Sequence, residues 1–239
     1  MRHRAAIVAG VLLAAAPAAA HDLITAESAE RYLQQARSWH ALAASPAPAA
    51  QRAEAQYRIG VMLDEIRELL NRDIAAHGVV QGLPSGYLVA ELQRQGSALA
   101  WAEKRRRYGT NTRYFEQALA LAPRGAHAKD AGWRLLQGRF YDSFDSDPLA
   151  GDEPWPRLAE QLALARDLAV GGLQGDAREE AEFIAAILHA RANLSAPDAA
   201  ARRDHGRRAR EASLAFETRH PDSLRSALMP VLRAALARN

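Results

Sequence analysis

Histidine and carboxylate side chains are the residues of this sequence that could do chemistry. The internal histidines form no H-E-x-x-H motif and no pair four residues apart, so their spacing indicates no metal site; they are His40, His77, His127, His189, His205 and His220. Glu27, Glu65 and Glu68 are candidate carboxylates for a cell-envelope hydrolase. Their positions give no paired geometry for a general acid and base, and we find no catalytic motif.

The segment 82–86, GLPSG, invites comparison with the nucleophile elbow of hydrolases. That motif, G-x-S-x-G, requires serine one position earlier and a preceding strand, and this sequence has neither. We therefore expect Ser85 to be the N-cap of the following helix.

An acidic segment, residues 142–156, is expected to be a loop because it contains prolines and breaks the helical pattern. Its carboxylates could supply oxygens to a calcium ion, but their spacing does not follow the EF-hand rule. They are Asp142, Asp145, Asp147, Asp152 and Glu153. We interpret the segment as a solvated acidic loop.

The N-terminus is typical of a secretory signal peptide. Arg2 and Arg4 precede an apolar run over residues 5–16, which is shorter than the roughly 20 residues of a membrane span. Small residues at Ala18 and Ala20 predict cleavage after Ala20. We expect residues 1–20 to be removed and the mature protein to be periplasmic, in the envelope of a Gram-negative bacterium.

Cleavage after Ala20 would make His21 the mature N-terminus. An α-amine and an imidazole on one residue form a bidentate nitrogen pair that suits copper(II). Copper is therefore a conditional cofactor, and periplasmic copper binding is the alternative function. No second histidine is indicated by the sequence.

Composition excludes several other classes of protein. The chain of 239 residues has no cysteine, which excludes disulfides and zinc–thiolate sites. The net charge is +3, and it becomes +1 without Arg2 and Arg4. This net charge gives no excess of positive charge for binding polyanions. Nucleic acid is also not an expected partner outside the cytoplasm.

A run of four cations is the clearest candidate for binding a partner. It lies in AWAEKRRRYGTNTRYF, where aromatic residues flank the basic ones. One interpretation is a solvated helix end whose charge favours the C-terminal dipole. The other is an edge that receives an acidic peptide or phospholipid head groups. The candidate residues are Lys104, Arg105, Arg106, Arg107 and Tyr108.

The fold class is expected to be all-α, since Ala, Leu, Arg and Glu dominate and strand-favouring runs are missing. We place helices at 26–43, 50–75, 87–107, 112–121, 128–141, 157–170, 177–193, 197–219 and 223–236. Asp176 and Glu179 would form a capping box for the seventh. Short helices with one apolar face can form a compact bundle or a hairpin array.

The segment YFEQALALAP resembles the second helix of a tetratricopeptide repeat, with Phe115, Ala118 and Pro123 at the large, small and helix-ending positions. Phe115 and Ala118 lie one turn apart, so the small residue lets a neighbouring helix approach beside the aromatic ring. Pro123 ends the helix.

Two further segments resemble the first helix of such a repeat. They are 133–140, with Trp133, Leu136 and Phe140, and 53–63, with Tyr57, Ile59 and Gly60. Other positions depart from the pattern: the expected glycine of one repeat falls at Leu99, and the acidic loop interrupts the array.

The resemblance implies one irregular tetratricopeptide-like domain over residues 21–239, with a compact helical bundle as the alternative. The implied function is that of a non-catalytic periplasmic scaffold that binds a protein or peptide partner. After signal cleavage we expect no transmembrane span, and peripheral membrane contact stays open.

Overall fold

The computed structural model describes residues 23–80, 82–97, 99–143, 147–149, 153–170 and 172–237. The expected signal peptide and His21 lie outside the described residues, as do Asp145 and Asp152 of the acidic segment.

The fold is all-α, as the sequence predicts. The α-helices of the described residues are α1 (Ala26–Ala44), α2 (Ala49–His77), α3 (Leu83–Arg94), α4 (Arg113–Leu121), α5 (Ala128–Tyr141), α6 (Trp155–Val170), α7 (Gly175–Ser195), α8 (Ala199–Arg219) and α9 (Met229–Leu236). Short 3-10 helices cover Glu103–Arg105 and Leu224–Leu228. The small antiparallel sheet pairs β1 (Trp101–Ala102) with β2 (Arg107–Tyr108).

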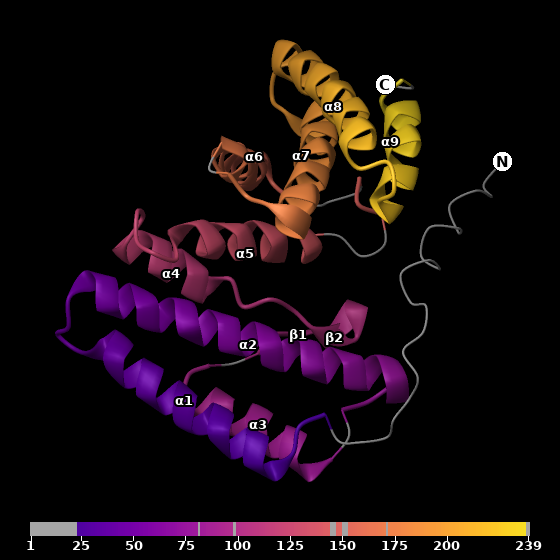
Figure 1. The fold of residues 1–239 in the computed structure, drawn as a ribbon. Coiled ribbons are helices and arrows are strands. Elements are labelled where there is room, and N and C mark those ends of the chain that lie inside the picture. Colours follow the sequence, from indigo (N-terminus) through magenta and orange to yellow (C-terminus); the bar gives the residue numbers. More distant parts are fainter. Residues whose placement is uncertain are drawn as a thin grey trace. The chain divides into compact units, whose positions relative to one another are not determined.

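The chain divides into two compact units, and the boundary between Tyr114 and Phe115 falls inside α4. In unit 1, α1 and α2 run side by side, and α3 packs against α1 (Figure 1). The core of unit 1 includes Leu33, Leu63 and Leu88, all fully buried. Thr25 and Ser28 cap the start of α1 reciprocally, which satisfies backbone donors of its first turn.

Unit 2 is built from consecutive helices, and from α5 onward each α-helix packs against the next (Figure 1). Three aromatic rings join α5, α7 and α8: Phe183 lies 6.3 Å from Phe140 and 6.1 Å from Phe216 between ring centroids. These rings belong to one continuous apolar core that also includes Leu232 of α9. Short amphipathic helices remove their apolar faces from water by packing against a neighbouring helix in this way.

The residues that carry the repeat resemblance are mostly buried. All eight of the following are buried: Tyr57, Ile59 and Gly60 on α2, Phe115 and Ala118 on α4, and Trp133, Leu136 and Phe140 on α5. Pro123 is exposed and lies two residues beyond the end of α4.

The helix predicted over 87–107 is wrong at its C-terminal end. α3 ends at Arg94, where Gly96 takes a φ of +79° and the Ser97 N–H reaches back to the Leu92 carbonyl at 2.8 Å. A left-handed glycine with this bond is a common helix stop. Residues 101–108 therefore form a hairpin, and the basic run does not lie at the end of an α-helix.

Two predicted caps are also wrong. Gly82 is the N-cap of α3, and Ser85 is buried inside the helix. Pro84 in the first turn favours this earlier start because its φ is already helical. Gln174 is the N-cap of α7 and makes no side-chain cap bond. Asp176 instead lies in the first turn, where its charge favours the helix dipole.

Candidate functional site

The predicted basic run forms the tip of the hairpin in unit 1. Trp101 pairs with Tyr108 and Ala102 with Arg107, and the Gly109 N–H donates to the Ala100 carbonyl at 2.8 Å. The rings of Trp101 and Tyr108 meet edge to face, with centroids 5.2 Å apart. The two aromatics therefore close the base of the hairpin and leave the charged residues at its tip.

The side chain of Asn71 attaches this hairpin to α2. Its amide nitrogen donates to the Tyr108 carbonyl at 2.9 Å, and its oxygen accepts from the Tyr108 N–H at 2.8 Å. The amide thus imitates a neighbouring strand and satisfies both backbone groups of one residue. Burial raises the pKa of the Tyr108 hydroxyl. Sequence inspection missed Asn71, because an isolated asparagine gives no signal of this contact.

Lys104, Arg106 and Arg107 are exposed at the tip, and Arg105 is half-buried. Lys104 and Arg106 form no ion pair with other residues that the structure describes. Glu103 is the single acid of the tip, and its carboxylate accepts from the Trp101 indole N–H at 2.6 Å. Trp101 keeps 45% of its surface exposed. The tip therefore presents cations next to an accessible aromatic ring.

The backbone of Arg106 lies in the left-handed region, with φ +48°. Among the described residues it is the sole non-glycine residue with a positive φ. This conformation costs an L-residue about 1–2 kcal/mol. Strain at an exposed loop tip is a recognised feature of binding sites, where the fold maintains a conformation that the residue alone would avoid.

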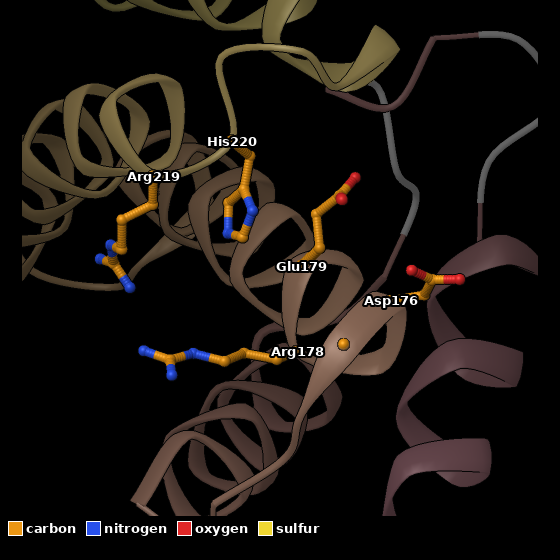
Figure 2. A pocket seen from close by; sticks show the side chains of 6 residues that line it. Asp176, Arg178, Glu179, Arg219 and His220 are labelled. Atoms are coloured by element: carbon orange, nitrogen blue, oxygen red, sulfur yellow. The ribbon is translucent and has the colours of Figure 1, made fainter.

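A second candidate region is a polar hollow of about 440 Å³ in unit 2. It lies between the first turn of α7 and the end of α8, and it is lined by Gly175, Asp176, Arg178, Glu179, Arg219 and His220. Figure 2 shows Arg178 and Arg219 extending to one side and Asp176 and Glu179 on the other, with His220 between them.

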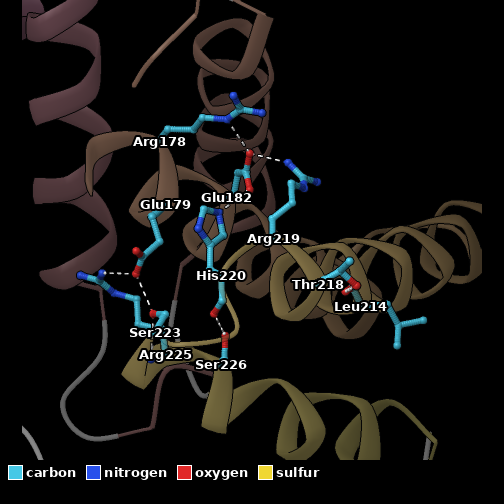
Figure 3. A network of polar contacts seen from close by, with 10 residues as sticks. All are labelled: Arg178, Glu179, Glu182, Leu214, Thr218, Arg219, His220, Ser223, Arg225 and Ser226. Atoms are coloured by element: carbon cyan, nitrogen blue, oxygen red, sulfur yellow. Dashed lines mark hydrogen bonds and ion pairs between the residues drawn. The ribbon is translucent and has the colours of Figure 1, made fainter. Parts of the chain in front are cut away.

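Glu182 of α7 accepts hydrogen bonds from three side chains that line this hollow. Arg178 donates from Nε at 3.0 Å and His220 from Nε2 at 3.0 Å, and Arg219 donates to the same carboxylate oxygen as Arg178 (Figure 3). Burial acts to raise the pKa of Glu182, but the bonds from Arg178 and His220 and the positive charge of Arg219 outweigh it and lower that pKa. Glu182 therefore fastens the end of α8 to α7.

Glu179, which lines the hollow, and Ser223 form a pair of a carboxylate and a hydroxyl group. The Ser223 hydroxyl donates to Glu179 at 2.6 Å, and Arg225 lies 3.1 Å from the same oxygen (Figure 3). The bond from Ser223, with the charge of Arg225, lowers the pKa of Glu179. A carboxylate stabilised in its charged form is a weak general base, so this pair gives no support for hydrolysis.

The acidic segment is tied to the core by a residue that sequence inspection missed. Arg191 of α7 is 3% exposed and donates to the Pro148 carbonyl at 2.6 Å, to Ser143 Oγ at 2.7 Å and to Glu153 at 3.2 Å. Burial raises the pKa of Glu153 against the opposing charge of Arg191. Glu153 is therefore half-buried and paired, and the expectation of a fully solvated acidic loop is wrong at this residue.

The other carboxylates proposed for chemistry lie on two helices of unit 1. Glu27 is in the first turn of α1, and Glu65 and Glu68 are on α2, all three exposed. Burial together with the nearby Glu65 raises the pKa of Tyr32 to about 12. Within the described residues, no three metal-binding side chains come together.

Comparison with protein-family models, with curated protein sequences and with solved structures finds no match for this chain. In the part of the chain that the structure describes, none of the helices combines the length and the apolar character needed to cross a membrane.

Proposed function

We propose that this chain is a non-catalytic helical-repeat protein of the bacterial envelope that binds an acidic segment of a protein or peptide partner. The basic hairpin is its contact surface, and export to the periplasm through the N-terminal signal peptide brings it to that partner. The observation that carries the proposal is the strained, exposed tip that presents Lys104, Arg106 and Arg107 beside Trp101.

Three further features support this proposal. The double hydrogen bond from Asn71 holds the hairpin in place before a partner arrives, which reduces the ordering cost of binding. Arginine and tryptophan are the residue types that dominate binding energy at protein interfaces. Sequential helix packing in unit 2 agrees with a hairpin array, the architecture that the tetratricopeptide resemblance implies.

The proposal predicts charge-dependent binding of an acidic peptide. The probe is a fluorescent peptide of eight glutamates, titrated in EDTA, with an eight-glutamine peptide as the neutral reference. The variant Arg105→Ala, Arg106→Ala, Arg107→Ala should bind about tenfold more weakly, because the loss of three ion pairs with the peptide, at about 0.2–1 kcal/mol each, sums to roughly one factor of ten. Added salt should weaken wild-type binding.

The matched control removes three exposed arginines from unit 2: Arg166→Ala, Arg203→Ala, Arg210→Ala. It lowers the net charge equally and should leave the affinity within about twofold. Equal affinity of wild type and the hairpin variant would remove the hairpin from the proposal. Preference for anionic lipid vesicles over the peptide would replace the protein partner with a membrane surface.

A further inference from the structure

Two histidines that are 16 residues apart in sequence meet between α7 and α8. Nδ1 of His189 lies 3.0 Å from Nδ1 of His205. The helices approach closely one residue further along, where Gly206 leaves no room for a side chain beside Asn193. The ring of Trp155, at the start of α6, meets His205 edge-on with centroids 5.8 Å apart. The pair therefore joins α6, α7 and α8.

The orientation of the two rings distinguishes a hydrogen bond from a shared metal ion. Their centroids are 5.2 Å apart and their nitrogens 3.0 Å apart, so the nitrogens lie almost on the line between the centroids. In this head-on arrangement the N–H of one ring points at the lone pair of the other. A shared metal requires both lone pairs to converge on a third point. The geometry is therefore that of an N–H···N hydrogen bond.

The number of protons decides whether this bond can exist. In the neutral pair, one Nδ1 carries hydrogen and the other accepts. One extra proton is tolerated, because a charged imidazolium still donates to a neutral imidazole. Two extra protons are not, because both Nδ1 atoms then carry hydrogen and two positive charges face each other. Such a pair releases its protons in two coupled steps.

The surroundings oppose the doubly charged form. Burial, followed by the neighbouring His205, lowers the pKa of His189 to about 4, and burial also lowers the pKa of His205. The other charged groups that act on the pair are Asp204 and Arg208, both on α8. Asp204 is itself held by Arg207 and Arg208, at 2.6 and 2.7 Å, which limits its ability to neutralise an imidazolium.

We propose that His189 and His205 form an acid-sensitive latch that holds α8 against α7 and α6 while the pair carries at most one extra proton, and opens when both rings are protonated. The latch stands independently of the proposed partner-binding function, because it lies in unit 2 and uses no residue of the hairpin. Its stabilising effect is complete above the ordinary histidine pKa of 6.5 and is lost as the pH falls toward about 4.

The first test is NMR of the imidazole nitrogens in the wild-type protein with EDTA present. Around pH 7.5, one of the two rings should be the Nδ1–H tautomer and the other the Nε2–H tautomer, and the pair should titrate in two separated steps. Two Nε2–H tautomers, or two independent titrations near the ordinary value, would overturn the latch. In a second sample without EDTA, stoichiometric copper(II) or nickel(II) binding that removes both signals would overturn it in favour of a metal site.

The second test compares amide hydrogen exchange of α8 at pH 7.5 and 4.5. In wild type, protection corrected for intrinsic exchange should fall at least about tenfold, the equivalent of one pKa unit. His189→Asn keeps a donor and an acceptor near the Nδ1 position without titrating, so it should lose much less protection. His127→Asn, at the start of α5, should behave as wild type. Equal losses in wild type and His189→Asn would contradict the proposal.

Discussion

Arg106 shows how the fold imposes a conformation on one residue. The chain must reverse between β1 and β2 within four residues, and Arg106 takes the left-handed angle that allows it, with its N–H donating to the Glu103 carbonyl at 3.2 Å. Glycine adopts this angle without a steric cost. In the proposed function, the contribution of the Arg106 guanidinium to binding would offset this strain.

Two substitutions separate the backbone of Arg106 from its charge. Arg106→Gly and Arg106→Ala both remove the guanidinium, so both should weaken binding of the acidic peptide to the same extent. Only glycine relieves the strain, and we expect the glycine variant to be about 1 kcal/mol more stable than the alanine variant. Chemical denaturation measures the difference. If the two variants unfold at the same denaturant concentration, the hairpin tip carries no strain in solution.

Among the elements, the α7–α8 pair is fastened near both ends by contacts of histidine side chains. The neutral His189–His205 pair lies near the connection between the helices, and His220 meets Glu182 at the other end. The ring of His220 also contacts that of Phe216 at the end of α8, with the two centroids 4.8 Å apart. We expect acid to weaken the first fastening, because burial lowers the pKa of both His189 and His205.

Glu182→Gln tests the fastening at the hollow. The variant loses the charge that holds Arg178, Arg219 and His220, so we expect a loss of about 1–2 kcal/mol in the free energy of unfolding at pH 7. Because the pKa of Glu182 is lowered in the fold, wild type should lose this advantage as the pH falls below the ordinary glutamate range, about 4.3.

The control for this experiment is Glu211→Gln, which breaks an exposed pair with Arg207 and should cost less than about 0.5 kcal/mol. Equal effects of the two variants, measured by denaturant unfolding between pH 3.5 and 7, would mean that Glu182 acts as an ordinary surface carboxylate.

At the scale of the whole molecule, export and maturation are the properties to measure first. Expression with the native N-terminus in a Gram-negative host should yield a periplasmic chain whose intact mass corresponds to a start at His21. The reason is the small residues at Ala18 and Ala20 that follow the apolar run. Retention of residues 1–20 in the purified chain would contradict the export proposal.

The same sample tests copper. If the His21 amine and imidazole bind copper(II), one additional residue placed before His21 should abolish tight binding, because the α-amine is then displaced from the imidazole. Binding that survives this extension would exclude the N-terminal site.

The helical class and most helix positions can be predicted from the sequence alone, because composition and apolar periodicity act within a few residues. The sequence also indicated buried positions of α4 and α5, since Phe115 and Ala118 on one segment, and Trp133, Leu136 and Phe140 on the other, are separated by about one helical turn. These properties are local, so each of them can be predicted from a single segment of the sequence.

Tertiary structure alone decided the contacts between distant residues. The hairpin depends on Asn71, 37 residues before Tyr108, and Glu153 pairs with Arg191, 38 residues later. The pairing of His189 with His205 depends on the register between two helices. None of these partners is marked by its own neighbours in sequence, because each contact forms only when packing of the apolar faces brings two remote polar groups within hydrogen-bonding distance.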